Sequence, residues 1–304
     1  MPIYVKDGGT WREISSDAGT QLYVRDSTSF TNKTITNAYV KNSGSWETVF
    51  TLFDTPTSFS TSTGSVAVPA NANAIHFQFA VGGGGGGVGG AEYDKAGGES
   101  AGAGGSSGGY ISDKVFSVTG GETLTISAGA GGAAGPGGYN TTGVSGGNTT
   151  VTGTSSSTLF TLTGGAGSSA SGGGVQGPLR SNATGAVGTA TISGTVLTTG
   201  TTVDGLNITS FTSGPVGTFN QSGSGNAGTN PGNCSGDNCS ITGGTGGSSY
   251  AGPGAVTGGT GAPAGGSGTV GTRGAGGGGG GAQPQSAGTA GGAGEVSYRF
   301  MRIA

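Results

Sequence analysis

Short stretches in which apolar and polar residues alternate recur along the chain, and runs of glycine follow them. The stretch 75–81 has an apolar residue at every second position, which predicts a half-buried β-strand. Further strands are expected at 65–70, 114–118, 122–126, 191–197, 206–211 and 295–300. Residues 119–121 are typical of a hairpin turn between two of these strands. Long amphipathic helices are absent from the pattern, so the predicted fold class is all-β.

The glycine runs decide how such strands can be held together. Glycine supplies 75 of the 304 residues, and only 8% of residues are charged. Large apolar residues are too few for a conventional core, so a folded chain must rely mainly on backbone hydrogen bonds. A flexible linker is one interpretation of the runs. The other is polyglycine-II-like extended helices packed side by side, which the apolar residues scattered through the runs favour.

In the packed alternative, the position of glycine predicts which helices lie inside. A Cβ atom pointing toward a neighbouring backbone would hold the two apart, so interior helices need glycine at nearly every position. The runs 82–90 and 274–281 are therefore expected to be the most interior. Residues 181–241 contain less glycine and are expected to form an insertion in this body.

Residues 1–54 differ from the rest, because charged residues are concentrated there and glycine is scarce. They contain an internal repeat in which 4–14 aligns with 39–49, and 23–30 is a degenerate copy. Each copy predicts a β-hairpin, with Trp11, Phe30 and Trp46 at equivalent positions. Lone hairpins are marginally stable, so either these units form a small self-contained sheet or the three aromatic residues pack between chains. We expect a module at 1–54 and a glycine-rich body at 55–304.

Charge and residue types narrow the function classes. The formal net charge is −3 with 11 scattered cations, which argues against nucleic-acid binding. Neither a secretory signal nor an apolar run long enough to span a membrane is expected. His76 is the single histidine, and carboxylates are sparse after residue 115, so no catalytic residues, cofactor or metal ligands are predicted. Glu92, Asp94 and Glu99 form either a solvated loop or a weak cation site.

Two cysteines stand in one short loop. Cys234 and Cys239 are separated by four residues that include glycine and asparagine, a spacing that a small disulfide ring would fit. Synthesis in a bacterial cytosol would leave both thiols reduced. The oxidised and the reduced state therefore both stay open.

Several motifs carry a resemblance to a known group of proteins. They are VPANANAIHFQFAVGGGGGG at 68–87, GGYISDKVFSVTGGETLTISAGAGGAAG at 108–135, and GGAGEVSYRFMRIA at 291–304. This part of the chain resembles the glycine-rich domains of bacteriophage tail-fibre and adhesin proteins. The YVKDGGTW and YVKNSGSW units near the N-terminus look like short repeats of phage structural proteins.

The resemblance implies a non-enzymatic virion protein, a tail fibre or receptor-binding adhesin, made in the host cytoplasm without a signal peptide. Its partners would be other tail or capsid proteins and a host-surface polysaccharide or outer-membrane protein, without nucleic acid or membrane insertion. A homo-oligomer is expected, and a trimer suits a fibre. Candidate receptor contacts are the aromatic residues among glycines: Tyr93, Tyr139, Phe219 and Tyr250. The alternatives are a structural virion component, such as a capsid decoration protein, head fibre or filament subunit, and a depolymerase.

Overall fold

The chain forms two compact units, Met1–Asp54 and Thr55–Ala304, in a computed structural model. The structure describes the strands between Ile3 and Ser60, and three short strands between Thr202 and Gly217. It also describes residues 63–70, 72–90, 102–137, 141–169, 186–197, 242–250, 255–262, 268–280 and 286–301. None of these residues is helical, which confirms the predicted all-β class.

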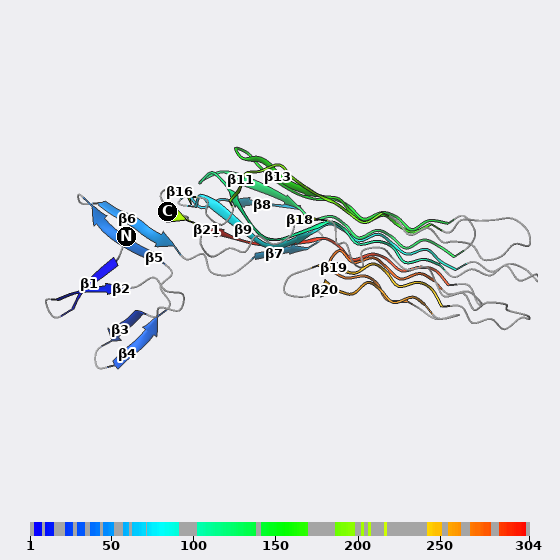
Figure 1. Cartoon of the computed structure of the whole chain (residues 1–304), viewed down its shortest axis with the longest axis horizontal. Helices are drawn as coiled ribbons and strands as arrows, with labels where there is room; N and C mark the ends of the chain where they lie inside the picture. Colours follow the sequence, from blue (N-terminus) through cyan, green and yellow to red (C-terminus); the bar gives the residue numbers. More distant parts are fainter. Residues whose placement is uncertain are drawn as a thin grey trace, which may run out of the picture. The chain divides into compact units, whose positions relative to one another are not determined.

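The first unit consists of three hairpins, one for each copy of the repeat (Figure 1). They are β1 (Ile3–Asp7) with β2 (Thr10–Ile14), β3 (Leu22–Asp26) with β4 (Ser29–Lys33), and β5 (Asn37–Asn42) with β6 (Ser45–Thr51). Each is antiparallel, and the strand ends pair across a two-residue turn. The predicted hairpin repeat is confirmed, including its degenerate middle copy.

The second unit contains two antiparallel sheets. The six-stranded sheet has the order β15 (Val196–Leu197), β10 (Tyr110–Ser117), β9 (Ala74–Val81), β21 (Glu295–Met301) and β7 (Thr57–Ser60), with β18 (Val216–Gly217) also paired to β10. The five-stranded sheet has the order β14 (Ala190–Ile192), β13 (Ser157–Leu162), β12 (Thr149–Gly153), β11 (Thr123–Ser127) and β8 (Thr63–Ala67). Two small hairpins complete the unit, β16 (Thr202–Val203) with β17 (Leu206–Asn207) and β19 (Ser249–Tyr250) with β20 (Ala255–Val256).

Aromatic side chains fill the space between the two sheets. The ring of Phe77 in β9 lies 4.9 Å from that of Phe160 in β13 and 5.6 Å from that of Phe116 in β10, edge to face in both pairs. All three side chains are fully buried. Aromatic pairs of this geometry stabilise a core beyond the area they bury. The sheets are thus joined by a conventional, though small, hydrophobic core.

The predicted half-burial of β9 is wrong. Seven of its eight residues are buried, and only Gln78 is exposed. The strand lies at the centre of the six-stranded sheet, and its second face is covered as well: Ala74 there packs with Val115 and Leu197. The alternation persists because this second face carries His76 and Gln78 between two alanines, and His76 is nevertheless buried.

The predicted hairpin over 114–126 is also wrong, because its two arms belong to different sheets. Strand β10 pairs with β9, and β11 pairs with β8 and β12. The turn between them is fixed by hydrogen bonds from Glu122 N to Thr119 O at 3.1 Å and from Gly121 N to Val68 O at 3.0 Å. The predicted strand 191–197 is divided in the same way, since β14 and β15 lie in different sheets.

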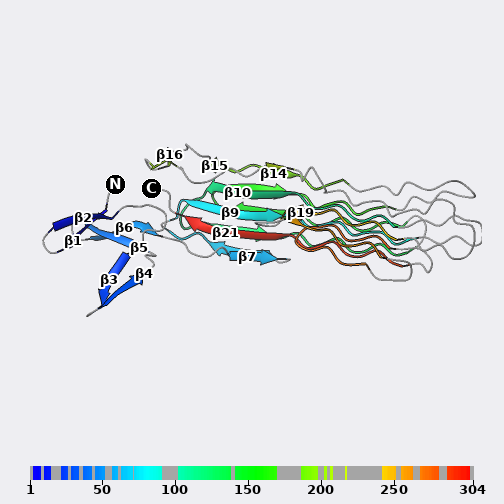
Figure 2. The same ribbon diagram turned by 60° about the horizontal axis from the view of Figure 1, so that its bottom comes forward.

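Glycine-rich tracts extend from the sheets and run side by side (Figures 1 and 2). We call the following segments the tract bundle: 82–90, 102–109, 128–137, 141–148, 163–169, 186–189, 242–248, 257–262, 268–272, 274–280 and 286–294. Every residue of 82–90 and of 274–280 is buried. This burial agrees with the prediction that these two runs are interior, although tract 102–109 is buried at every residue as well.

The N–H groups of tract 82–90 are directed to three neighbouring tracts in a repeating order. Those of Gly82, Gly85 and Val88 donate to carbonyls within 103–109 at 2.8–3.0 Å. The N–H groups of Gly83 and Gly86 donate to carbonyls within 144–147, and those of Gly84, Gly87 and Gly90 donate to carbonyls within 286–292. Gly89 N, at the end of the tract, donates to Pro136 O of tract 128–137 at 3.3 Å. The direction of hydrogen bonding therefore repeats every third residue.

The carbonyl groups of the same tract follow the same period. They accept hydrogen bonds of 2.8–3.2 Å from three other tracts, within 165–168, 132–135 and 277–280. A threefold extended helix requires this three-residue repeat. The polyglycine-II helix itself is defined by backbone angles and stays a prediction.

Close approach of the backbones explains the glycine. A Cβ atom added at any residue from Gly83 to Gly87 would lie 1.9–2.1 Å from a carbonyl oxygen of a neighbouring tract. Such distances are far inside van der Waals contact, so a side chain there would force the tracts apart. Glycine is needed at these positions because the backbones of neighbouring tracts lie too close for a side chain.

Candidate functional site: the distal end of the tract bundle

Several described tracts end at the side of the tract bundle farthest from the sheets (Figure 1). We call it the distal end. Hydrogen bonds from Gly90 N to Ser286 O at 3.0 Å and from Gly102 N to Gly280 O at 2.8 Å hold tract ends together there. The described residues of the distal end flank 91–101, 138–140, 170–185, 263–267 and 281–285. Five connecting segments therefore share one anchored face.

Two predicted receptor contacts belong to these segments. Tyr93 lies in 91–101 and Tyr139 lies in 138–140, and both are outside the described residues. Phe219, Cys234 and Cys239 are also outside the described residues. Their roles as receptor contacts or as a disulfide stay predictions. The acidic residues of 91–101 fall in the same undescribed part.

Tyr250 is placed differently from the others. Its backbone lies in strand β19, paired with Ala255 of β20. This hairpin lies where the tracts meet the sheets, because Val256 packs on Phe79 and Val81 of β9. The structure therefore brings Tyr250 to the opposite end of the bundle from the segments that contain Tyr93 and Tyr139.

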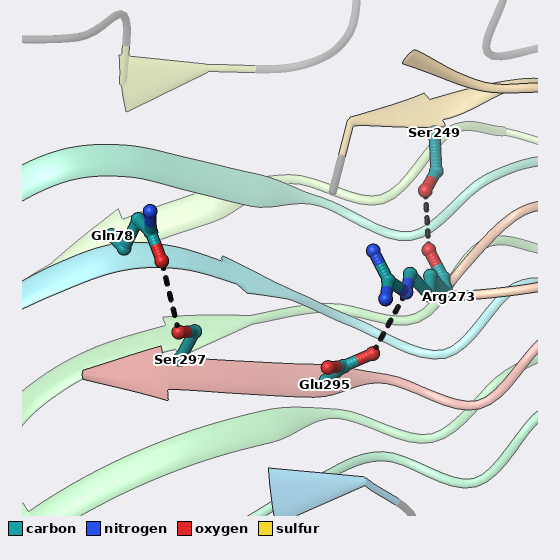
Figure 3. Close-up of polar contacts among 5 residues, drawn as sticks. All are labelled: Gln78, Ser249, Arg273, Glu295 and Ser297. Atoms are coloured by element: carbon teal, nitrogen blue, oxygen red, sulfur yellow. Dashed lines mark hydrogen bonds and ion pairs between the residues drawn. The ribbon is translucent and has the colours of Figure 1, made fainter. Parts of the chain in front are cut away.

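A tight turn at Arg273 and Gly274 anchors the bundle to the sheets (Figure 3). Both residues have positive φ, 42° and 74°, a conformation that costs energy for arginine. Arg273 Nε forms an ion pair with Glu295 Oε2 at 3.2 Å, and its guanidinium lies 6.0 Å from the centre of the Phe79 ring. Ser249 Oγ donates a hydrogen bond to the Arg273 carbonyl oxygen. These contacts hold the turn in its strained form.

Polar side chains on β9 pair with β21. Arg299 Nε donates to His76 Nδ1 at 3.0 Å, and His76 is buried. Ser297 Oγ donates to Gln78 Oε1 at 3.3 Å (Figure 3). The single histidine is thus part of a sheet contact. Within the described ranges, no group of three or more histidine, cysteine, aspartate or glutamate side chains could hold a metal ion.

Glu122 is the most extensively bonded carboxylate in the described residues. It is buried and accepts hydrogen bonds from Thr119 N at 2.7 Å, from Ser155 N and Ser156 N at 3.0 Å, and from Ser156 Oγ. Burial raises its pKa, but the hydrogen bonds to the ionised form prevail and leave the pKa below its ordinary value. The carboxylate joins the turn before β11 to the turn between β12 and β13. This role is structural, and the sequence analysis did not identify it.

The three aromatic candidates of the first unit occupy equivalent register positions. Trp11 pairs with Lys6, Phe30 with Arg25, and Trp46 with Lys41 across their hairpins. In every copy of the repeat, the backbone register partner of the aromatic residue is therefore a lysine or an arginine. A role of these residues in oligomerisation or virion attachment stays a prediction.

A family model for a glycine-rich domain matches residues 58–301. The chain belongs to this glycine-rich domain family. The matched residues run from the second residue of β7 to the last residue of β21 and so include nearly all of both sheets and the whole tract bundle. No curated protein matches the chain. In the described part of the glycine-rich domain and its N-terminal hairpins, no helix has the length and apolar character to cross a membrane.

Proposed function

We propose that this glycine-rich domain protein is a non-enzymatic bacteriophage virion protein, a tail fibre or receptor-binding adhesin that contacts the host cell surface. The observation that carries the proposal is the distal end, where five connecting segments leave one face of a hydrogen-bonded bundle. A hydrogen-bonded scaffold that presents connecting segments at one end suits recognition, because binding residues are commonly held on loops above ordered elements.

The tract bundle supports this function through its bonding. Tract ends fixed by backbone hydrogen bonds limit the freedom of the segments they carry, which lowers the entropy lost on binding. Tyr93 and Tyr139 in these segments would stack on sugar rings or on loops of an outer-membrane protein. The hairpins of 1–54 would attach the protein to the virion or to further copies of the chain. No bound cofactor is part of this proposal.

The first test is the location of the protein. Mass spectrometry of purified particles, followed by immunogold electron microscopy, should find the full chain at the tip or side of the tail. Absence from particles would overturn the virion assignment. Labelling on the capsid would instead favour the alternative of a decoration protein or head fibre, and labelling along a filament would favour a structural subunit.

The second test is receptor contact by the full-length chain. Purified protein should compete with particles for adsorption to host cells, and the Tyr93→Ala/Tyr139→Ala variant should compete about tenfold less well, as loss of a stacking contact would predict. Tyr250→Ala is the matched control, because Tyr250 lies at the opposite end of the bundle. Equal competition by wild type and the double variant would exclude these tyrosines as contacts. Cleavage of surface polysaccharide by the wild-type chain would favour a depolymerase.

A further inference from the structure

Tract 163–169 lies at an exposed lateral edge of the tract bundle. Its N–H groups show how backbone donors are satisfied at that edge. Those of Thr163 and Ala166 donate to backbone carbonyls in 186–189, and those of Gly165 and Ser168 donate to Gly83 and Gly86. The N–H groups of the third direction, at Gly164 and Gly167, donate to no backbone carbonyl of another tract among the described residues. The N–H groups in that direction are bonded by side chains instead.

Two side chains of the neighbouring tract 141–148 supply these bonds. Asn148 Oδ1 accepts from Gly164 N at 3.1 Å, and Ser145 Oγ accepts from Gly167 N at 3.4 Å. The donors and the acceptors are each three residues apart, so the side chains follow the period of the bundle. Both side chains are exposed. In the bundle interior, the corresponding N–H groups donate to the backbone of another tract.

The same arrangement recurs at two other exposed edges. Thr163 Oγ1 accepts from Thr189 N at 2.6 Å, and Thr269 Oγ1 accepts from Thr260 N at 2.7 Å. An exposed row of unpaired backbone groups is a template for association, which natural β-sheets avoid by covering or blocking their edges. A tract with N–H groups at three-residue spacing presents the same hazard.

We propose that Ser145 and Asn148 close this edge of the bundle against a further glycine tract, and that the tract they exclude belongs to a second copy of this chain. A matching partner must offer carbonyl groups at three-residue spacing with no side chain between them. The glycine tracts of this chain have that form, and a second copy is always present at equal concentration.

The test is the Ser145→Ala/Asn148→Ala variant of the full chain, compared with wild type by sedimentation velocity over a series of protein concentrations. The variant should form species larger than those of wild type, with the midpoint concentration about tenfold lower, which corresponds to a gain of about 1.4 kcal/mol in association. At concentrations below association, amide exchange at Gly164 and Gly167 should become faster, while exchange at Gly165 stays as in wild type.

Two variants serve as controls. Thr142→Ala removes an exposed side chain from the same outward series in 141–148 and should behave as wild type. Ser145→Thr/Asn148→Asp retains both acceptor oxygens and should keep the edge closed. If the double alanine variant loses its circular dichroism spectrum, Asn148→Ala alone removes the shorter bond and is measured in its place. A folded variant with wild-type sedimentation at every concentration would overturn the proposal.

Discussion

The sheets and the tract bundle of the second unit have interiors made of different material. Between the sheets, side chains such as Phe77 and Phe160 exclude water and contact one another edge to face. Inside the bundle, residues such as Gly85 contribute only backbone, and carbonyl oxygens lie where a Cβ atom would stand. The sheets therefore depend on hydrophobic burial, which is non-directional. The bundle depends on hydrogen bonds, which must nearly all be made.

This difference predicts opposite responses to substitution. A hydrophobic core tolerates changes that keep its volume and loses stability when atoms are removed. The centre of the bundle contains few side-chain atoms that a substitution could remove, so a methyl group added at an interior glycine should harm it most. Glycine also loses more conformational freedom on folding than other residues, so the bundle begins with a larger entropic cost to offset.

Gly85→Ala should produce the largest effect. The new Cβ atom would lie 2.1 Å from the carbonyl oxygen of Ala166, and relief of that clash would break several tract hydrogen bonds together. We expect the free energy of unfolding to fall by about 5 kcal/mol or more in denaturant titrations. Gly147→Ala is the matched control, because its nearest backbone atom is 2.9 Å away and the next is 3.4 Å away. Equal losses in the two variants would contradict close packing as the reason for glycine.

Phe160→Ala should produce the next largest loss of stability, and it tests the hydrophobic core between the two sheets. Removal of a fully buried ring that contacts Phe77 and Phe116 leaves a cavity, which costs about 3–5 kcal/mol. Phe160→Leu should recover a large part of that loss, because it refills the cavity. Thermal unfolding followed by calorimetry measures both variants. No recovery in Phe160→Leu would show that ring geometry, and not volume, stabilises this core.

Glu122→Gln should lower the free energy of unfolding by less than Phe160→Ala, about 2 kcal/mol near neutral pH. The loss arises because hydrogen bonds to an ionised acceptor are removed. The native pKa of Glu122 lies below its unfolded value. Its ionised form therefore contributes stability above the unfolded pKa of about 4.3, and the contribution disappears as pH falls through the native pKa. Unfolding titrations from pH 7 to pH 3 should show wild type and variant converging.

Glu295→Gln is the control for this pH effect. Its partner Arg273 is half-exposed, so its ion pair should contribute less than about 1 kcal/mol. A stability difference between wild type and Glu122→Gln that stays constant down to pH 3 would argue against an ionised Glu122 as the joining group.

Ser107→Ala should have the smallest effect and compares two hydroxyl groups inside the bundle. Ser107 Oγ is buried and has no hydrogen-bond partner in the described part of the chain. Its removal should leave stability unchanged or raise it by up to about 1 kcal/mol. Ser168 Oγ, by contrast, donates to Ala103 O at 2.7 Å and accepts from Val88 N at 2.9 Å. Ser168→Ala should lower the free energy of unfolding by about 1–3 kcal/mol. A larger loss in Ser107→Ala than in Ser168→Ala would contradict this prediction.

Features with a local cause were predictable from sequence. Alternation marked β9 and β21, the repeat marked the three hairpins, and steric crowding marked 82–90 as interior. Strand partners were not predictable, because they depend on distant segments. The run 114–126 has the local pattern of a hairpin, yet the edges of β10 and β11 are taken by strands of two different sheets. The short turn between them then has to cross from one sheet to the other.

The candidate site also combines features that were predictable from local sequence with features that depend on distant segments. The connecting segments with Tyr93 and Tyr139 were recognisable as aromatic residues among glycines, but that they leave a common end follows only from the order in which tracts pair. The role of Glu122 was missed because its partners Ser155 and Ser156 are more than thirty residues away. The signal available in the sequence was an isolated carboxylate directly after a Thr-Gly-Gly turn. Arg273 carried no signal, since glycine is the expected residue at positive φ.

The three-residue repeat of hydrogen-bond direction in 82–90 has a consequence for inheritance. Insertion of one codon in this tract would rotate every later N–H toward the wrong neighbour. Insertion of three codons would restore the original phase and lengthen the tract by one repeat. Length variation among descendants of this gene should therefore occur in steps of three amino acids inside the bundle, while the segments at its far end are free to change by any number.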